Sequence, residues 1–138
     1  MQNVTEKKKR VSILVVEDNA ANVFLTGEIL SESEKASYEI SAIKNGVEAL
    51  EFLRGTNDFT STSRTKLIIL DLNLPGMHGF DLLARIKTDP ELKGIPVCVL
   101  TTSEAGEDMQ TAKDLNADGY LIKPLDLCKF EEICAGIS

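Results

Sequence analysis

The stretch LIILDLNLPGMHGF, residues 67–80, decides the fold of this chain. Four apolar residues run directly into Asp71, and Pro75, Gly76 and Gly79 follow. A short apolar run bounded by turn residues predicts a strand that is buried on both faces of a parallel sheet. The residue after such a strand lies at the edge where open α/β sheets hold their ligands. A single aspartate there could also cap the next helix, so the partners of Asp71 elsewhere in the chain must distinguish the two roles.

Similar short apolar runs recur along the sequence and alternate with stretches of helical spacing. The runs are residues 13–16, 38–43, 67–70, 97–100 and 120–122. The residues at helical spacing are Ala20, Val23, Gly27 and Leu30; Val47, Leu50 and Leu53; Phe80, Leu83 and Ile86; Ala105, Met109, Ala112 and Leu115; and Leu127, Phe130, Cys134 and Ile137. Asn45-Gly46 and Asp126 are typical helix starts. Five such β–α units predict an α/β fold, a doubly wound five-stranded parallel sheet with helices on both faces.

The chain of 138 residues has the length of one domain. We expect residues 1–10, which end in the basic run KKKR, to form a flexible leader, and residues 11–138 to form the folded domain. The polar segment 55–65 is typical of a flexible loop before the third strand.

Charge and composition restrict the possible partners and the compartment. The net charge of −7 disfavours nucleic-acid binding, because a phosphate backbone would be repelled. No apolar stretch approaches the length of a membrane span. Three cysteines without a CxxC pair do not indicate a disulfide framework, which favours a reducing, cytoplasmic location.

Polar residues follow four of the five predicted strands. Glu17, Asp18 and Asn19 follow the first strand, and Asp71 follows the third. The segment 101–103, Thr-Thr-Ser, follows the fourth strand, and Lys123-Pro124 follows the fifth. Because the carboxyl ends of parallel strands open on one edge of a sheet, we expect these side chains to converge.

The converging residue types indicate a metal-assisted phosphoryl transfer. Three carboxylates close together repel one another, and Lys123 supplies only one positive charge. Oxygen ligands favour Mg²⁺ as the complement. With the metal and Lys123 neutralising phosphoryl oxygens, the carboxylate of Asp71 can attack phosphorus and form an acyl phosphate, and the Thr101 hydroxyl can bond the new group. Glu17, Asp18 and Asp71 could each be a helix cap, but their convergence with Lys123 disfavours that interpretation.

The chain resembles the response-regulator receiver domains of two-component signalling systems. The resemblance covers residues 11–137 and is carried by ILVVEDN, LIILDLNLPGMHG, VLTTS and YLIKP, in this order and spacing. It implies the flavodoxin-like receiver fold, with Asp71 as phospho-acceptor. It implies that Mg²⁺ is held by Glu17, Asp18, Asp71 and the backbone carbonyl of Asn73. It further implies that Thr101 is the switch hydroxyl, Tyr120 the aromatic switch residue, and Lys123 the phosphate-contacting lysine before a cis Pro124.

Narrower features are similar to stand-alone regulators that serve bacterial and cyanobacterial phytochromes. These features are DLNLPGMHG, LTTSEA, IKPLDL and the polar loop before the third strand. The resemblance implies a sensor histidine kinase of phytochrome type as donor and an unidentified downstream protein as target. It implies no enzymatic activity beyond the domain's own phosphorylation and dephosphorylation. The apolar content of the last helix, at Leu125, Leu127, Phe130, Ile133 and Ile137, together with this resemblance predicts a homodimer through that helix.

Two residues depart from the usual receiver pattern. Thr102 stands where most receivers have a small residue, which predicts narrower access to the phosphorylation site. His78, the only histidine, replaces an acidic or amide residue, and we expect it to be a surface loop residue. The donor histidine must therefore come from a partner protein.

The main alternative is a haloacid-dehalogenase-type, Mg²⁺-dependent phosphatase, which also uses an aspartate nucleophile, a hydroxyl and a lysine. That family needs a second aspartate two residues after the nucleophile, where this chain has Asn73, whose amide cannot act as the acid. A flavodoxin-like flavin binder would need a phosphate-cradling loop after the first strand, where this chain has two acids. A purely structural module is disfavoured because every residue required for phosphorylation is present.

Overall fold

A computed structural model of the protein describes residues 8–56 and 65–137. The elements are β1 (Lys9–Val16), α1 (Ala20–Leu30), β2 (Ala36–Ile43), α2 (Gly46–Thr56), β3 (Leu67–Leu70), α3 (Gly79–Thr88), β4 (Val97–Thr101), α4 (Gly106–Asp114), β5 (Gly119–Ile122) and α5 (Leu127–Ile137). The five strands form one sheet in the order β2-β1-β3-β4-β5, and every neighbouring pair is parallel. The predicted doubly wound five-stranded parallel sheet is therefore confirmed.

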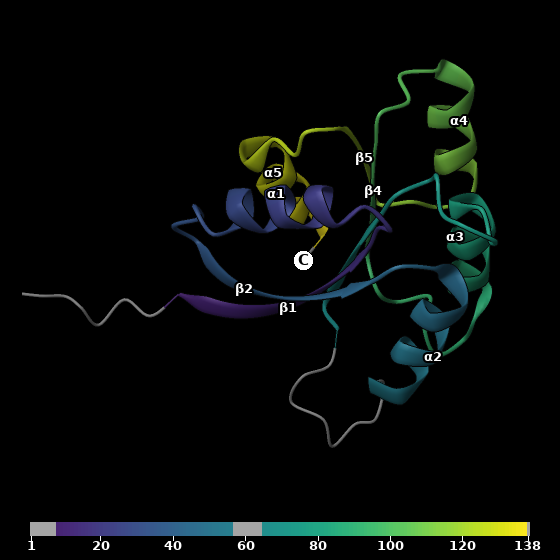
Figure 1. The fold of residues 1–138 in the computed structure, drawn as a ribbon, viewed down its shortest axis with the longest axis horizontal. Coiled ribbons are helices and arrows are strands. Elements are labelled where there is room, and N and C mark those ends of the chain that lie inside the picture. Colours follow the sequence, from purple (N-terminus) through teal and green to yellow (C-terminus); the bar gives the residue numbers. More distant parts are fainter. Residues whose placement is uncertain (1–7, 57–64, 138) are drawn as a thin grey trace, which may run out of the picture.

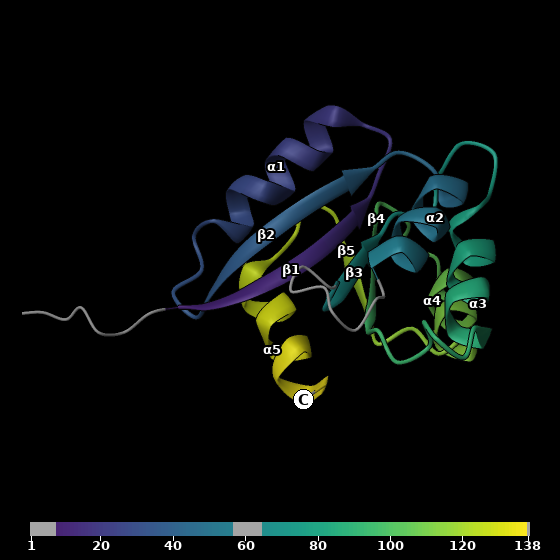
Figure 2. The ribbon, with the colours of Figure 1, turned by 90° about the horizontal axis from the view of Figure 1, so that it is seen from below.

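Helices cover both faces of this sheet. Figures 1 and 2 show α2, α3 and α4 grouped on one side of the strands and α1 and α5 on the other. Each side has its own apolar core: Leu53 and Leu83 pack in the first, and Leu30 and Phe130 pack in the second. Burial on both faces explains why the central strands read as continuous apolar runs and do not alternate.

Strand β3 is the clearest example. All four of its residues are buried, and it lies between β1 and β4 in the sheet. Leu67 is opposite Ile13 of β1, and Ile69 is opposite Cys98 of β4. The stretch 67–70 is thus a central strand, as its composition predicted.

Side-chain caps begin four of the helices. The two predicted caps are confirmed: Asn45 Oδ1 accepts a hydrogen bond from Glu48 N (2.9 Å), and Asp126 Oδ1 accepts one from Lys129 N (3.0 Å). Two caps were not predicted. Asn19 caps α1, and the exposed His78 caps α3 by accepting a hydrogen bond from Phe80 N at Nδ1 (3.0 Å). His78 is therefore both a surface residue, as expected, and a helix cap.

Some boundaries and faces differ from the expectations. Strand β1 begins at Lys9, so the last two residues of the expected leader belong to the sheet, and residues 1–7 lie outside the described part. Helix α2 includes Gly55 and Thr56 of the expected loop. Residues 57–64 of that loop lie outside the described part of the chain. Val47 is 56% exposed. At about 100° per residue it lies roughly 120° around the helix from Leu53, beyond the stripe that packs.

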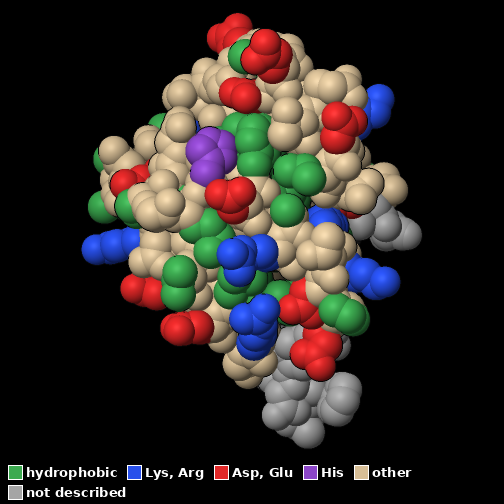
Figure 3. Space-filling model, turned by 90° about the vertical axis from the view of Figure 1, so that its right-hand side faces the viewer, with side chains coloured by type: hydrophobic (Ala, Val, Ile, Leu, Met, Phe, Trp, Pro, Cys, Tyr) green, Lys and Arg blue, Asp and Glu red, His purple; other side chains and the backbone are tan. Residues whose placement is uncertain are grey.

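No helix among residues 8–56 and 65–137 combines the length and apolar composition that a membrane span requires. On the face seen in Figure 3, Lys and Arg side chains are scattered among Asp and Glu side chains. The predicted absence of nucleic-acid and membrane partners stays a prediction.

Gly79 fixes the chain where β3 passes to α3. Its N–H donates to the Leu72 carbonyl (2.9 Å). A Cβ atom built on Gly79 would lie 2.5 Å from Leu72 Cα and 2.6 Å from the Asp71 carbonyl oxygen. Both neighbours are backbone atoms that cannot rotate away, so only glycine fits beside the segment that carries Asp71.

We predict that Gly79→Ala destabilises the fold by about 1–3 kcal/mol, because the added methyl must displace the backbone after β3. Urea unfolding measures the change. Gly94→Ala is the matched control, since a Cβ there meets no atom within 4 Å, and we expect it to stay within about 0.5 kcal/mol of the parent. Equal stability of the two variants would contradict the packing argument.

Candidate functional site at the carboxyl edge of the sheet

The predicted site residues meet at the carboxyl edge of the sheet. Glu17 follows β1, Asp71 follows β3, Thr101 ends β4, and Lys123 follows β5. Backbone hydrogen bonds continue the sheet beyond the strand ends. Asp71 N donates to the Val16 carbonyl (3.0 Å), and Lys123 N donates to the Thr101 carbonyl (2.8 Å). The sheet therefore sets the relative positions of residues that are far apart in sequence.

Three carboxylates gather at this edge. Each of Glu17, Asp18 and Asp71 places a carboxylate oxygen within 4.8 Å of the others. Glu17 and Asp71 are each 5% exposed, whereas Asp18 is open to solvent. Two acids thus form the floor of the site, and the third lies at its opening.

The ammonium group of Lys123 joins the two buried acids. Its Nζ donates to Glu17 Oε1 at 2.6 Å and to Asp71 Oδ2 at 3.3 Å. Burial alone lowers the pKa of Lys123, but the hydrogen bonds and negative charges of Glu17 and Asp71 outweigh it and raise the pKa above its ordinary value. Lys123 is therefore a full positive charge at neutral pH and balances one of the three carboxylates.

Backbone N–H groups orient the two buried carboxylates. Asn73 N donates to Asp71 Oδ1 (3.3 Å), and Asn19 N donates to Glu17 Oε2 (3.2 Å). Asn73 is thus brought to the site through its N–H. The ligand role expected for its carbonyl stays a prediction.

Ser103 connects the site to α4, and sequence reasoning missed its contacts. Thr101 is fully buried, and its Oγ1 accepts a hydrogen bond from Ser103 N (3.3 Å). The Ser103 hydroxyl donates to Asp108 of α4 (2.6 Å), and the Tyr120 hydroxyl donates to the Ser103 carbonyl (3.0 Å). The two expected switch residues, Thr101 and Tyr120, are therefore bonded to one residue between them. A serine before the acidic first turn of α4 was the signal in the sequence.

The unusual Thr102 is exposed and lies beside the site. It lines a pocket of about 290 Å³ together with Asn22 and Leu25 of α1, Lys123 and Pro124. The peptide bond between Lys123 and Pro124 is cis, as the resemblance implied. The narrower access expected from Thr102 stays a prediction.

We predict that Lys123→Met lowers the free energy of unfolding in EDTA by about 1–3 kcal/mol, because two buried carboxylates lose their charged donor. The folded-state pKa of Lys123 is raised above its ordinary 10.5. Its stabilisation is therefore complete below that pH and is lost as the pH rises through the raised value. Urea unfolding at pH 8 and at pH 11 should show the difference between parent and variant shrinking at the higher pH.

Lys113→Met serves as the control for this measurement, because Lys113 is exposed and has no ion-pair partner among the described residues. A loss of stability in this control as large as that in Lys123→Met would overturn the assignment.

Comparison with known proteins identifies the family and the architecture of the chain. The response regulator receiver domain family matches residues 13–135. Response regulator Rcp1 of Synechocystis is 38% identical over 125 residues, which are 91% of this chain and 84% of the relative. The crystal structure of the phosphorylated cyanobacterial phytochrome response regulator RcpA is 40% identical, with a TM-score of 0.72 over 95% of this chain and 91% of that chain.

A second solved structure, the Mn²⁺-bound form of Rcp1, is 38% identical, with a TM-score of 0.72 over 92% of this chain and 91% of that chain. The family match spans most of the chain, and both solved structures share its sheet. The acids, the Thr101 hydroxyl and the lysine converge at one edge of the sheet, as the sequence predicted. The chain belongs to the response regulator receiver domain family of two-component signalling proteins.

Proposed function

We propose that Asp71 accepts a phosphoryl group from the phosphohistidine of a sensor kinase and that the domain thereby switches its binding to other proteins. The observation that carries this proposal is the constellation of Glu17, Asp18 and Asp71 with a single ammonium group 3.3 Å from Asp71. Three carboxylates with one cation form a site with surplus negative charge, which suits a divalent metal ion. That ion together with Lys123 would neutralise the oxygens of an incoming phosphoryl group.

The transfer forms one bond and breaks another at phosphorus. A carboxylate oxygen of Asp71 bonds to phosphorus while the bond between phosphorus and the imidazole nitrogen breaks. The imidazole leaves with the electron pair and takes a proton from solvent. Lys123, already within reach of Asp71, stabilises negative charge on the phosphoryl oxygens. Asn73 N–H holds the attacking carboxylate in place.

The residues present fit a Mg²⁺ ion. Glu17, Asp18 and Asp71 offer three carboxylate oxygens within 4.8 Å of one another, and the Asn73 carbonyl is the fourth ligand in our proposal. Oxygen donors of this kind suit hard divalent cations. When bound, the ion would balance the negative charge of the phosphoryl oxygens and reduce the repulsion among the three carboxylates. The Mn²⁺-bound Rcp1 structure shows that a relative takes a divalent cation.

We propose that the donor is a sensor histidine kinase of phytochrome type. The basis is the similarity to the phosphorylated cyanobacterial phytochrome response regulator RcpA. The chain's only histidine, His78, caps α3 and is exposed, so it is an unsuitable internal donor. The donor histidine in this proposal belongs to a partner.

Phosphorylation is read out, in our proposal, through Thr101, Ser103 and Tyr120. A hydrogen bond from the Thr101 hydroxyl to the new phosphoryl group competes with the bond that Thr101 now accepts from Ser103 N. Movement of Ser103 changes its contacts with Asp108 and Tyr120. The surface of α4 and β5 is therefore the one that a downstream protein reads.

The dehalogenase-type phosphatase finds no support. The chain belongs to the receiver family, and Asn73, at the position of that family's second aspartate, is a hydrogen-bond donor to Asp71 through its backbone. Receiver domains are signalling domains, and we propose that this one catalyses no reaction beyond its own phosphorylation and dephosphorylation.

We predict that Asp71→Asn abolishes phosphorylation, because an amide cannot displace the leaving group at phosphorus. Two donors are used with Mg²⁺ present: acetyl phosphate and an autophosphorylated phytochrome-type kinase. Intact-protein mass spectrometry detects the phosphoryl adduct, and radiolabel transfer follows the kinase reaction.

Asp81→Asn is the control, since Asp81 is an exposed residue of α3, and it should be phosphorylated like the parent. A full adduct on Asp71→Asn would refute the acceptor assignment. Transfer from acetyl phosphate but from no phytochrome-type kinase would refute the partner alone.

We further predict that Mg²⁺ stabilises the parent through the acidic cluster. A ligand that binds only the folded state at ~10 times its dissociation constant adds roughly 1.4 kcal/mol, which raises the melting temperature by about 3–6 °C. Asp18→Asn removes one charge from the cluster. It should therefore melt higher than the parent in EDTA and lose most of the Mg²⁺-dependent rise. Differential scanning calorimetry measures both effects.

Sodium chloride at matched ionic strength is the control, because screening does not replace direct ligation. A parent whose melting temperature is the same in EDTA and in ~10 mM Mg²⁺, well above typical working concentrations for such sites, would rule out the metal site.

The homodimer through the last helix remains a proposal, but this helix leaves less apolar surface exposed for a partner than its sequence predicted. Leu125 and Phe130 are buried, and Leu127 and Ile133 pack against the same core. The remaining residue, Ile137, has no described side chain. We predict a dimer by light scattering at high concentration. A mass that stays at the monomer's 15.1 kDa, with and without a phosphoryl mimic, would refute it.

A further inference from the structure

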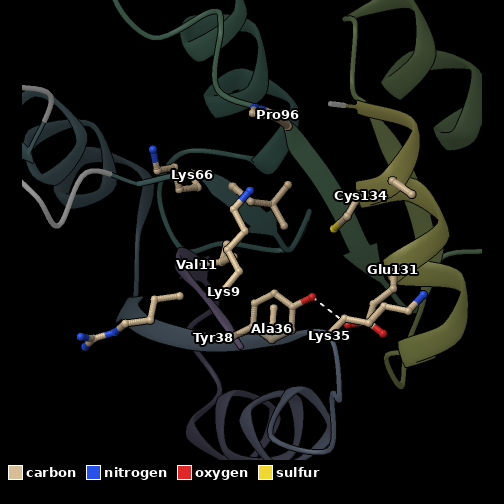
Figure 4. Close-up of a pocket in the computed structure, with 12 residues that line it drawn as sticks. Lys9, Val11, Lys35, Ala36, Tyr38, Lys66, Pro96, Glu131 and Cys134 are labelled. Carbon is tan, nitrogen blue, oxygen red and sulfur yellow. Dashed lines mark hydrogen bonds between the residues drawn. The ribbon is translucent and has the colours of Figure 1, made fainter. Parts of the chain in front are cut away.

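A second pocket lies at the opposite end of the sheet from the acidic site. Its volume is about 400 Å³, within the range of small-molecule sites, which is about 300–1,000 Å³. The amino ends of β1 and β3, the start of β2 and the last turns of α5 surround it, as Figure 4 shows. None of its lining residues belongs to the site around Asp71.

Unpaired cations surround this pocket. Lys9, Lys35 and Lys66 line it, and none of the three forms an ion pair within residues 8–56 and 65–137. Arg10 also lines it but is paired with Glu39. The chain as a whole has a net charge of −7, so a cavity lined by three lysines without ion pairs differs in sign from the protein's overall charge. Their combined field favours an anion at the opening of the pocket.

The interior of the pocket is apolar. Val11 and Leu67 of the sheet, Ala36 and Pro96 contribute to its lining. In Figure 4 the sulfur of Cys134 points from α5 toward the pocket. A ligand that fills this space must bury apolar surface as well as carry charge.

One carboxylate, Glu131, also lines the pocket, and hydrogen bonds hold it at the α5 wall. Its Oε2 accepts hydrogen bonds from the hydroxyls of Tyr38 (2.9 Å) and Ser33 (2.5 Å). Burial, followed by the hydrogen bond to Glu131, raises the pKa of Tyr38, so the phenol stays a donor at neutral pH. The Glu131 carboxylate therefore already accepts two hydrogen bonds from the protein, whereas the ammonium groups of the three lysines can contact a bound anion.

We propose that this pocket binds a small amphipathic anion, with its acyl or ring body against Val11, Leu67 and Cys134 and its acidic group at Lys9 and Lys66. The combination of apolar lining and unpaired cations distinguishes this class from neutral lipophiles and from hydrophilic anions. The pocket is independent of the proposed phosphorylation of Asp71, because the two sites share no residue.

The test uses octanoate as probe on the full chain, with 1-octanol and octylammonium as head-group controls. Binding is measured by two-dimensional NMR titration. Octanoate should shift the amide signals of Val11, Ala36 and Leu67, and it should bind more tightly than 1-octanol, with octylammonium weakest. Equal binding of octanoate and 1-octanol would overturn the proposal, as would shifts centred on other residues.

Cys134 provides an independent readout that needs no variant. Alkylation by iodoacetamide is followed by peptide mapping, in which cleavage after Lys129 separates Cys134 from Cys128. Octanoate should slow the modification of Cys134 and leave that of the exposed Cys128 unchanged. An unchanged rate at Cys134 under saturating octanoate would overturn the proposal.

Charge removal completes the test. Lys9→Gln/Lys66→Gln should weaken octanoate binding about fivefold, as expected for two solvent-accessible ion pairs. Lys44→Gln/Lys113→Gln removes the same charge from exposed positions outside the pocket and should bind as the parent does. A similar loss of affinity in both double variants would show that only net charge matters and would overturn the site.

Discussion

The ammonium group of Lys123, shared between Glu17 and Asp71, is the interaction on which the rest of the site depends. It lies 2.6 Å from one carboxylate and 3.3 Å from the other, and both acids are almost completely buried. Without a cation, the negative charges of two buried carboxylates this close would repel each other and oppose folding. A single ammonium balances only one of the three carboxylates. In our proposal a divalent metal ion compensates the remaining negative charge and so allows a phosphoryl group to approach Asp71.

The sheet makes this arrangement possible because it brings residues from the ends of four strands to one edge. Apolar packing on both faces holds the strands in register, and the polar residues are the ones that extend past their ends. Ser103 then connects the buried Thr101 to α4 and to Tyr120. In the proposed switch, a change at Asp71 reaches α4 and Tyr120 through Ser103.

The two ends of the sheet differ in charge. Acids gather at the carboxyl edge, around Asp71, while lysines gather at the amino end, around Val11 and Leu67. The same parallel topology produces both clusters, because it collects all strand ends of one kind together. The acidic edge accounts for the receiver chemistry, and the basic pocket is available for a different ligand.

All five strands could be predicted from the sequence pattern, most clearly β3 and β4, because a strand buried on both faces is apolar throughout. The chain order of Glu17, Asp71, Thr101 and Lys123 after those strands also determined the site, because parallel strand ends share an edge. Only the tertiary structure decided that Val47 is exposed, that β1 starts at Lys9, and that Leu125 and Phe130 are buried. It alone also revealed the bonds of Ser103 and the lysine-lined pocket. These features depend on contacts between distant segments, which periodicity and spacing along one chain do not encode.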